Sequence, residues 1–140
     1  MDKVIIDTDV ILDFFFDRKP FANYSAEILN LCATKKLKGY TTPVIISNVY
    51  YLLRKTAKHD TIIEKIKQLL NIIDIIKIDK NAVLNALNSD FKDFEDALQN
   101  FSAIESGQIN IILTRNLKDF KKSELAILTP ETYLKGNTRG

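Results

Sequence analysis

Hydrophobic and polar positions follow two patterns along the chain, which predict short strands separated by helices. Five runs of aliphatic residues are typical of strands that are buried within a sheet. They are "KVIID" (3–7), "GYTTP" (39–43), "IIDIIKID" (72–79), "INIILT" (109–114) and "LAILT" (125–129). Between these runs, apolar residues recur every three or four positions, which is the period of an amphipathic helix. The chain is therefore expected to alternate between strand and helix throughout its length.

The helical segments are bounded by residues that cap or end helices. Seven are expected: 9–17, 25–32, 44–58, 60–71, 81–88, a segment that ends at Gly107, and a final turn from Pro130. Aspartate accepts hydrogen bonds from the free amides of a first helical turn. Asp9 and Asp60 are therefore expected to cap the first and fourth segments, and Asp90 or Asp93 the sixth.

Short strands that alternate with amphipathic helices form a parallel sheet with helices on both faces. The sequence therefore predicts an α/β fold, a three-layer α/β/α sandwich with a mostly parallel central sheet. Residues 1–135 are expected to form a single domain, and residues 136–140 a loose tail. Ligands of such sheets bind beyond the carboxyl ends of the strands, where the strand order reverses. Asp7 ends the first strand and Thr114 the fourth, so they meet if these strands are neighbours.

Composition and charge argue against several classes of protein. Hydrophobic residues make up 46% and charged residues 27% of the chain, as in soluble globular domains. The single Cys32 has no disulfide partner and no signal peptide is recognisable, so we expect a reducing, cytoplasmic setting. No apolar run approaches the ~20 residues that a membrane-spanning helix needs. The net charge of +2 is too small for a dedicated DNA-coating protein.

Acidic residues gather at three places that the predicted fold brings toward the strand ends. They are Asp7 with Asp9, Asp96 with Glu95 and Asp93, and Asp119. Carboxylates within ~6 Å of one another repel and raise each other's pKa unless a positive charge lies between them. A hard cation such as Mg²⁺ supplies that charge, and it needs only one or two direct carboxylates beside its waters. His59 stands alone in the sequence, which argues against zinc.

Four stretches resemble the motif series of the PIN-domain endoribonucleases, the fold of VapC-type toxins. They are "VIIDTDVILDFF" (4–15), "SNVYYLLRK" (47–55), "DFEDALQNFSAIESG" (93–107) and "ILTRNLKDF" (112–120). The resemblance extends from Val4 to about Leu134, and the last two motifs at this separation are its most specific part. It implies a metal-dependent cut in single-stranded RNA, with Mg²⁺ or Mn²⁺ as the ion.

The resemblance also implies roles for individual residues and for partners. Asp7, Asp96 and Asp119 match the first, third and fourth acids of the family, and are expected to be catalytic and to bind the metal. Asp9 and Glu95 are further metal candidates, with Asn48, Thr114 and Asn116 in support. Substrate contacts are expected from Arg115, Arg54 and Lys55. A toxin role would bring a small antitoxin over the acidic cleft and a homodimer.

Two positions depart from the family pattern and keep alternatives open. Asp9 stands where the family usually has asparagine, and Asn48 takes the place of the second acid, a glutamate on the third helix. Loss of that glutamate weakens metal capture, which leaves open a PIN fold that only binds RNA or protein. The opening "VIIDTDV" also fits haloacid-dehalogenase-like phosphatases, in which Asp7 would attack phosphate and Asp9 would act as acid and base. That family needs a later acidic pair directly after a strand, whereas Glu95 and Asp96 fall in a predicted helix.

Several candidate residues also have purely structural interpretations. Asp93 is expected to cap a helix, with Asp96 in the position that completes a capping box. Arg115 would either grip a phosphate or neutralise an aspartate. Of Tyr50 and Tyr51, at least one is expected in the core, and an exposed one would be placed to stack on bases.

Overall fold

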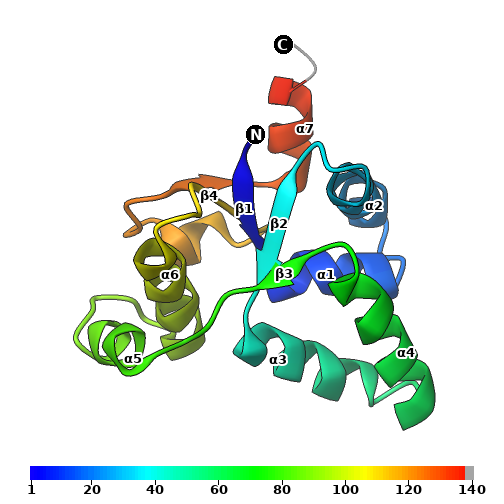
Figure 1. Ribbon diagram of the computed structural model, residues 1–140, viewed down its shortest axis with the longest axis horizontal. Helices are drawn as coiled ribbons and strands as arrows, with labels where there is room; N and C mark the ends of the chain where they lie inside the picture. The colour runs from blue at the N-terminus through cyan, green and yellow to red at the C-terminus, as the bar shows by residue number, and fades with distance from the viewer. Residues whose placement is uncertain (138–140) are drawn as a thin grey trace.

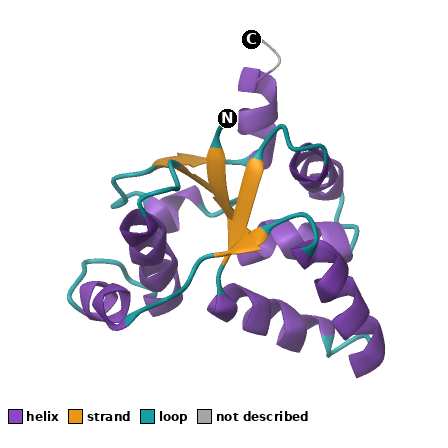
Figure 2. Ribbon diagram, viewed as in Figure 1, coloured by secondary structure: helices purple, strands orange, loops and turns teal. Residues whose placement is uncertain are grey.

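The computed structural model describes residues 1–137, which form a parallel sheet between two layers of helices (Figures 1 and 2). The sheet has five strands in the order β3-β2-β1-β4-β5, and every neighbouring pair is parallel. The strands are β1 (Lys3–Ile6), β2 (Lys38–Thr41), β3 (Asp74–Ile75), β4 (Ile111–Leu113) and β5 (Ala126–Leu128). Four fall within the predicted aliphatic runs, and β2 begins one residue before its run.

Strand β1 lies at the centre of the sheet and carries the start of the chain into the core. Val4 is paired with Gly39 on β2 and with Ile111 on β4. Helices cover both faces of this strand, so its side chains are buried whichever way they point, and Val4, Ile5 and Ile6 have no exposed surface. This explains why the opening run is continuously aliphatic rather than alternating with polar residues. The strand order reverses between β1 and β4, so the first and fourth strands are neighbours, which is the condition under which Asp7 and Thr114 meet.

The helices form one layer on each face of the sheet, which confirms the three-layer α/β/α fold. Figure 1 shows α1 to α4 on one side of the strands and α5 with α6 on the other. The helices are α1 (Thr8–Phe15), α2 (Phe21–Ala33), α3 (Pro43–Leu53), α4 (His59–Leu70), α5 (Lys80–Leu87), α6 (Phe94–Ser106) and α7 (Pro130–Asn137), with a 3₁₀ turn η1 (Leu117–Phe120). Helix α7 lies against α2, beside the N-terminal end of β1.

The helix ends confirm some predicted caps and correct others. Asp93 caps α6 by accepting a hydrogen bond from the Asp96 N–H at 3.0 Å, and Gly107 ends the same helix at φ 67°. Asp7, not Asp9, is the N-cap of α1, because the chain leaves β1 and enters the helix without an intervening loop. The N-cap position of α4 is Lys58, so the prediction that Asp60 caps this helix is wrong. Asp60 lies instead in the first turn, where a negative charge favours the helix dipole.

The C-terminal segment differs slightly from its prediction. Helix α7 continues to Asn137 and so includes the first two residues of the predicted tail, while residues 138–140 lie outside the described part of the chain. None of the helices between residues 1 and 137 combines the length and the apolarity that a bilayer crossing requires.

Candidate active site

A cleft of about 640 Å³ opens at the carboxyl ends of the central strands, and its walls are rich in acids. Residues that follow β1 and β4 form its floor, α3 forms one wall, and the start of α6 with η1 forms the other. The acidic residues that line it are Asp7, Asp9, Asp93, Glu95, Asp96 and Asp119. The three separate acidic stretches of the sequence therefore share one cavity, as the strand order predicted.

Asp7 is held in place by hydrogen bonds to both of its carboxylate oxygens. The Thr8 N–H donates to Oδ1 at 2.8 Å, and the Thr114 hydroxyl donates to Oδ2 at 2.7 Å. Thr114 is fully buried and follows β4, so this contact joins the ends of the two central strands. The Asn116 N–H donates in turn to the Thr114 hydroxyl at 3.0 Å. Thr114 and Asn116 thus support Asp7, which agrees with their predicted place.

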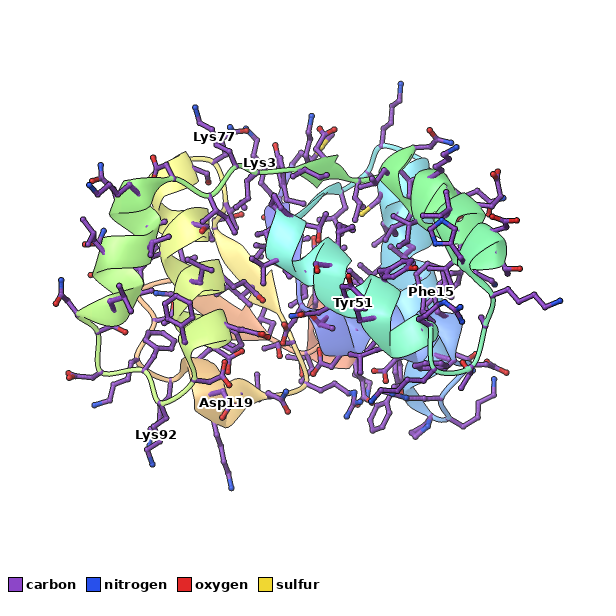
Figure 3. The ribbon with its side chains drawn as sticks, turned by 90° about the horizontal axis from the view of Figure 1, so that it is seen from below. Lys3, Phe15, Tyr51, Lys77, Lys92 and Asp119 are labelled. Atoms are coloured by element: carbon purple, nitrogen blue, oxygen red, sulfur yellow. The ribbon has the colours of Figure 1, made fainter. Side chains whose placement is uncertain are left out.

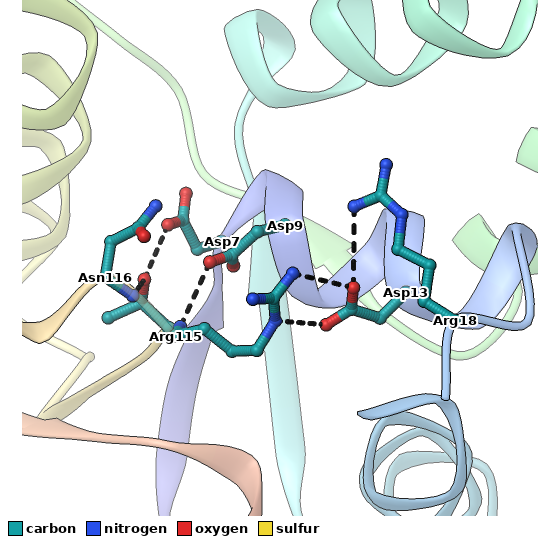
Figure 4. Close-up of polar contacts among 7 residues, drawn as sticks. Asp7, Asp9, Asp13, Arg18, Arg115 and Asn116 are labelled. Atoms are coloured by element: carbon teal, nitrogen blue, oxygen red, sulfur yellow. Dashed lines mark hydrogen bonds and ion pairs between the residues drawn. The ribbon is translucent and has the colours of Figure 1, made fainter. Parts of the chain in front are cut away.

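Asp9 lies one residue into the first turn of α1 and also contacts the segment after β4. The backbone N–H of Arg115 donates to its Oδ2 at 3.1 Å (Figure 4). Its other oxygen, Oδ1, is buried without a hydrogen-bond partner among the described residues. A buried carboxylate oxygen that lacks a partner is costly unless a cation or a water reaches it.

Burial and mutual repulsion raise the pKa of the acids in the cleft. Burial and then the charge of Asp9 raise the pKa of Asp7 from 3.8 to about 7, against hydrogen bonds from Thr114 and Thr8 that lower it. Burial, followed by repulsion from Asp7, Asp93 and Asp119, raises the pKa of Asp96 to about 7. Burial likewise raises the pKa of Asp9, which hydrogen bonding and charge from Arg115 oppose. The cleft therefore favours a bound cation or proton.

The acids face one another across the cleft without closing into a ready chelate. In the described part of the chain, no three side chains of His, Cys, Asp or Glu are close enough to hold one ion together. That Asp7 and Asp96 bind a metal directly, with Asp119 orienting a metal-bound water or helping to hold a second ion, stays a prediction. The three residues still influence one another electrostatically, since Asp7 and Asp119 both act on the pKa of Asp96.

Asn48, which departs from the family pattern, is bonded to an acid on the opposite wall. Its Nδ2 donates to Glu95 Oε2 at 2.8 Å, and so connects α3 with the first turn of α6. The side chain that replaces the usual second acid thus orients another carboxylate at the edge of the cleft. Both residues line the cavity.

Two of the three predicted substrate-binding residues lie outside the cleft. The Arg115 guanidinium makes a two-pronged ion pair with buried Asp13, Nε to Oδ2 at 2.6 Å and Nη2 to Oδ1 at 2.9 Å (Figure 4). It also lies over the Phe21 ring, 3.9 Å from the ring centroid. Of its two predicted roles, Arg115 therefore has the second, the neutralisation of an aspartate. It pairs with Asp13 because that residue is buried, with only 1% of its surface exposed. Arg54 donates to the Ala57 carbonyl at 3.2 Å, just after the end of α3. Of the three, only Lys55 lines the cavity.

Sequence reasoning missed Asp13 and Arg18. Arg18 lines the cleft, and its Nη1 lies 3.5 Å from Asp13 Oδ1, so that Asp13 lies between two arginines (Figure 4). Asp13 follows Asp9 by four positions and so shares its side of α1, which is the signal that would have placed it near the site. Arg18 follows the predicted first helix, 9–17, and its position in the sequence gives no indication that it lines the cleft.

The raised pKa of Asp7 leads to a prediction about stability. An acid whose pKa is higher in the folded protein than in the unfolded chain stabilises the fold when protonated, so this contribution is present below pH ~4 and is lost as the pH rises toward 7. Asp7→Asn keeps a neutral side chain of the same shape. At pH 8 it is expected to raise the free energy of unfolding by about 2 kcal/mol, as measured by urea denaturation in the absence of metal.

The same comparison at pH 4 should find the two proteins nearly equal. Asp60→Asn, which neutralises an exposed aspartate on α4, should give no gain at pH 8. An Asp7→Asn protein that is less stable than the unsubstituted protein at pH 8 would contradict the sign of the effect.

Comparison with known proteins identifies the family. The model of the PIN domain family matches residues 3–118. Ribonuclease VapC1 of Aquifex aeolicus (strain VF5) is 33% identical over 137 residues, which cover 94% of this chain and 93% of that protein.

Solved structures agree at the level of the fold. VapBC2 from Rickettsia felis, bound to a DNA fragment from its promoter, is 16% identical with a TM-score of 0.66, and the match covers 90% of this chain and 96% of the other. VapC20 of Mycobacterium tuberculosis, a sarcin-ricin loop cleaving toxin, is 14% identical with a TM-score of 0.66, over 88% and 96% of the two chains. The matched family model, the curated relative and the central acidic cleft agree, and the chain belongs to the PIN-domain family.

Proposed function

We propose that this protein is a divalent-metal-dependent endoribonuclease that cleaves single-stranded RNA and acts as the toxin of a toxin–antitoxin pair. The observation that carries the proposal is the cleft at the ends of β1 and β4, in which acids from three distant segments meet. Membership of the PIN-domain family and the similarity to a ribonuclease over nearly the whole chain support the same reaction.

The donor set of the cleft fits a hard divalent cation. Its acids offer oxygen ligands only, two of them have a pKa near 7, and one buried oxygen of Asp9 lacks a partner. Mg²⁺ keeps several waters and binds through one or two carboxylates, so it does not need a preformed cage. Asp7 and Asp96 would hold the ion, with Asp119 and Asp9 acting through its waters. When bound, the ion lowers the pKa of a water to form the nucleophile and neutralises charge on the phosphate.

The protein's own side chains have the tasks of orientation and charge balance. Thr114 holds Asp7 through its hydroxyl, and the Arg115 N–H holds Asp9, so both carboxylates keep fixed directions. The basic residues that line the cleft are Arg18 and Lys55, which lie on the α1 and α3 side of the acids. Groups placed in advance around the reacting phosphate need no rearrangement during the reaction, which is the main source of rate in such sites.

Glu95 supplies the negative charge that Asn48 lacks. The hydrogen bond between these residues points the Glu95 carboxylate along the edge of the cleft. Glu95→Gln is expected to weaken Mn²⁺ affinity or cleavage by about 10- to 100-fold, the usual effect of losing a residue that supports a metal site. Binding of Mn²⁺ is measured by titration calorimetry, and cleavage by single-turnover assay.

A charge exchange provides the control for this prediction. Asn48→Glu alone places two carboxylates against each other and should not help. Asn48→Glu combined with Glu95→Gln restores a donor–acceptor pair with the charge on α3, and should recover most of the lost affinity. Unchanged Mn²⁺ affinity in Glu95→Gln would mean that Glu95 does not support the metal site.

Partners follow from the same proposal. An antitoxin that covers the acidic cleft is supported by similarity to VapBC2, whose fold this chain shares. The predicted homodimer and the cytoplasmic location stay predictions. The phosphatase alternative loses its support, because the pair Glu95 and Asp96 lies in the first turn of α6 rather than directly after a strand.

The function is tested with purified protein and a labelled single-stranded RNA. Mn²⁺ should support internal cleavage, EDTA should stop it, and fresh Mn²⁺ should restore it, while the same RNA in duplex form is cut far more slowly. RNA that stays intact with Mg²⁺ and Mn²⁺ would contradict the proposal. Beryllofluoride captured on Asp7 in that case would indicate a phosphatase instead.

A further inference from the structure

Helix α3 carries a row of side chains from the acids of the cleft to its outer end. Asn48 and Tyr51 are three positions apart on one face of α3, Lys55 follows four positions later in the turn after the helix, and all three line the cavity. With a rise of about 1.5 Å per residue, the helical part of the row, from Asn48 to Tyr51, extends roughly 4.5 Å along the helix axis. It begins at the contact with Glu95 and ends at a cation.

Tyr51 is exposed in a way that packing does not explain. The side chain is 67% exposed, although it is a large aromatic on a helix whose other face is buried in the core. Its neighbour Tyr50 is half-buried, and the Tyr50 hydroxyl is bonded to His59 Nδ1 at 2.8 Å. The two rings meet edge to face, with centroids 4.9 Å apart, so Tyr50 supports the Tyr51 ring from one side. Figure 3 shows Tyr51 on α3, at the surface of the view from below.

The surroundings of Tyr51 suit a flat, polyanionic ligand. Lys55 lies four positions further along the chain, in the turn after α3, and Arg18 lines the same cavity from the segment after α1. An amphipathic helix of a protein partner would need a continuous apolar groove. Tyr51 instead has a cation one turn away and acids deeper in the cleft, which is the pattern of single-strand channels that combine stacking with contacts to phosphate.

We propose that Tyr51 is the platform on which a base of single-stranded RNA stacks beside the scissile phosphate, with Lys55 contacting the next phosphate. This subsite rests on the proposed function, because it assigns the nucleotide that flanks the reacting group. It gives the enzyme a requirement for unpaired bases, since a base within a duplex cannot reach the ring. Stacking accepts any base, so the subsite selects single strands rather than a sequence.

The test measures RNA binding in an Asp7→Asn background, where the substrate is not consumed. A single-stranded RNA carries 2-aminopurine at one position at a time, and its affinity and fluorescence are recorded. Tyr51→Ala is expected to weaken affinity about tenfold and to abolish the fluorescence change at one position. Tyr51→Phe should stay within twofold. Phe14→Ala, which removes an exposed aromatic outside the cleft, should change neither quantity.

Salt dependence tests the second contact. Lys55→Ala should lower the slope of log affinity against log salt by about 0.7, the value for one phosphate contact with a single strand. Unchanged affinity and fluorescence in Tyr51→Ala would overturn the subsite, even if the unsubstituted protein cleaves RNA. Tyr51-dependent binding by a protein that never cleaves RNA would instead uphold the subsite and remove the proposed reaction.

Discussion

Asp7→Asn and Asp96→Asn are each expected to lower the rate of RNA cleavage by at least about 100-fold. Each substitution removes one negative charge from the cleft while keeping the shape of the side chain. In Asp7→Asn the amide oxygen still accepts from the Thr8 N–H, and the amide nitrogen donates to the Thr114 hydroxyl instead of accepting from it. A divalent cation bound in the cleft then loses a carboxylate partner at the centre of the site. The measurement is a single-turnover assay with excess protein, Mn²⁺ and a labelled single-stranded RNA.

The same two variants distinguish a lost site from a lost fold. Both should remain folded by circular dichroism, and Asp7→Asn should gain stability at alkaline pH because its carboxylate has a pKa of about 7. Asp60→Asn lies outside the cleft and should cleave normally. Equal cleavage by the unsubstituted protein and both variants would mean that the activity comes from a contaminating nuclease and that these acids are not catalytic.

Arg115→Met is expected to lower the free energy of unfolding by about 3 kcal/mol, the typical cost of leaving one member of a buried ion pair alone. Asp13 is almost completely buried and receives two hydrogen bonds from the Arg115 guanidinium. Arg18 remains at 3.5 Å but is partly exposed, so it compensates only in part. Urea denaturation at pH 7 measures the change.

Two further variants test whether the loss of unfolding free energy comes from the buried ion pair. Arg18→Ala should cost less than about 1 kcal/mol, because its ion pair is long and partly exposed. Asp13→Leu combined with Arg115→Met replaces the pair by apolar groups and should be clearly more stable than Arg115→Met alone. A loss below 1 kcal/mol for Arg115→Met would contradict the interpretation of Arg115 as a structural residue, and would return it to the list of substrate contacts.

The fold was largely predictable because the chemistry of each element is local. A continuous aliphatic run such as Val4 to Ile6 is only compatible with a strand covered on both faces, and Gly107 ends α6 as glycine commonly does. Cap positions were less predictable. Asp7, Asp9 and Asp60 are equally good capping residues by type, and the choice depends on how directly the preceding segment enters the helix.

The site was predictable as a set of acids but not as a set of contacts. Parallel strands place Asp7 and Thr114 together once β1 and β4 are neighbours, and the family motifs indicate Asp96 and Asp119. Arg115 illustrates the limit of this reasoning. It lies two residues after the end of β4, between the predicted site residues Thr114 and Asn116. Its side chain nevertheless turns to Asp13, whose burial depends on the packing of α1. Side-chain direction at such positions depends on partners distant in sequence.

The central place of β1 also has a consequence for the order in which the molecule is made. Val4 pairs with Gly39 on β2 and with Ile111 on β4, and the Asp7 carboxylate is held by Thr114, so the second neighbour of β1 lies more than a hundred residues downstream. Contacts of such long sequence separation form late and slow folding. A nascent chain that has not yet brought β4 out of the ribosome therefore has no assembled cleft. Synthesis of the chain as far as Thr114 therefore precedes any activity of a nuclease with this topology.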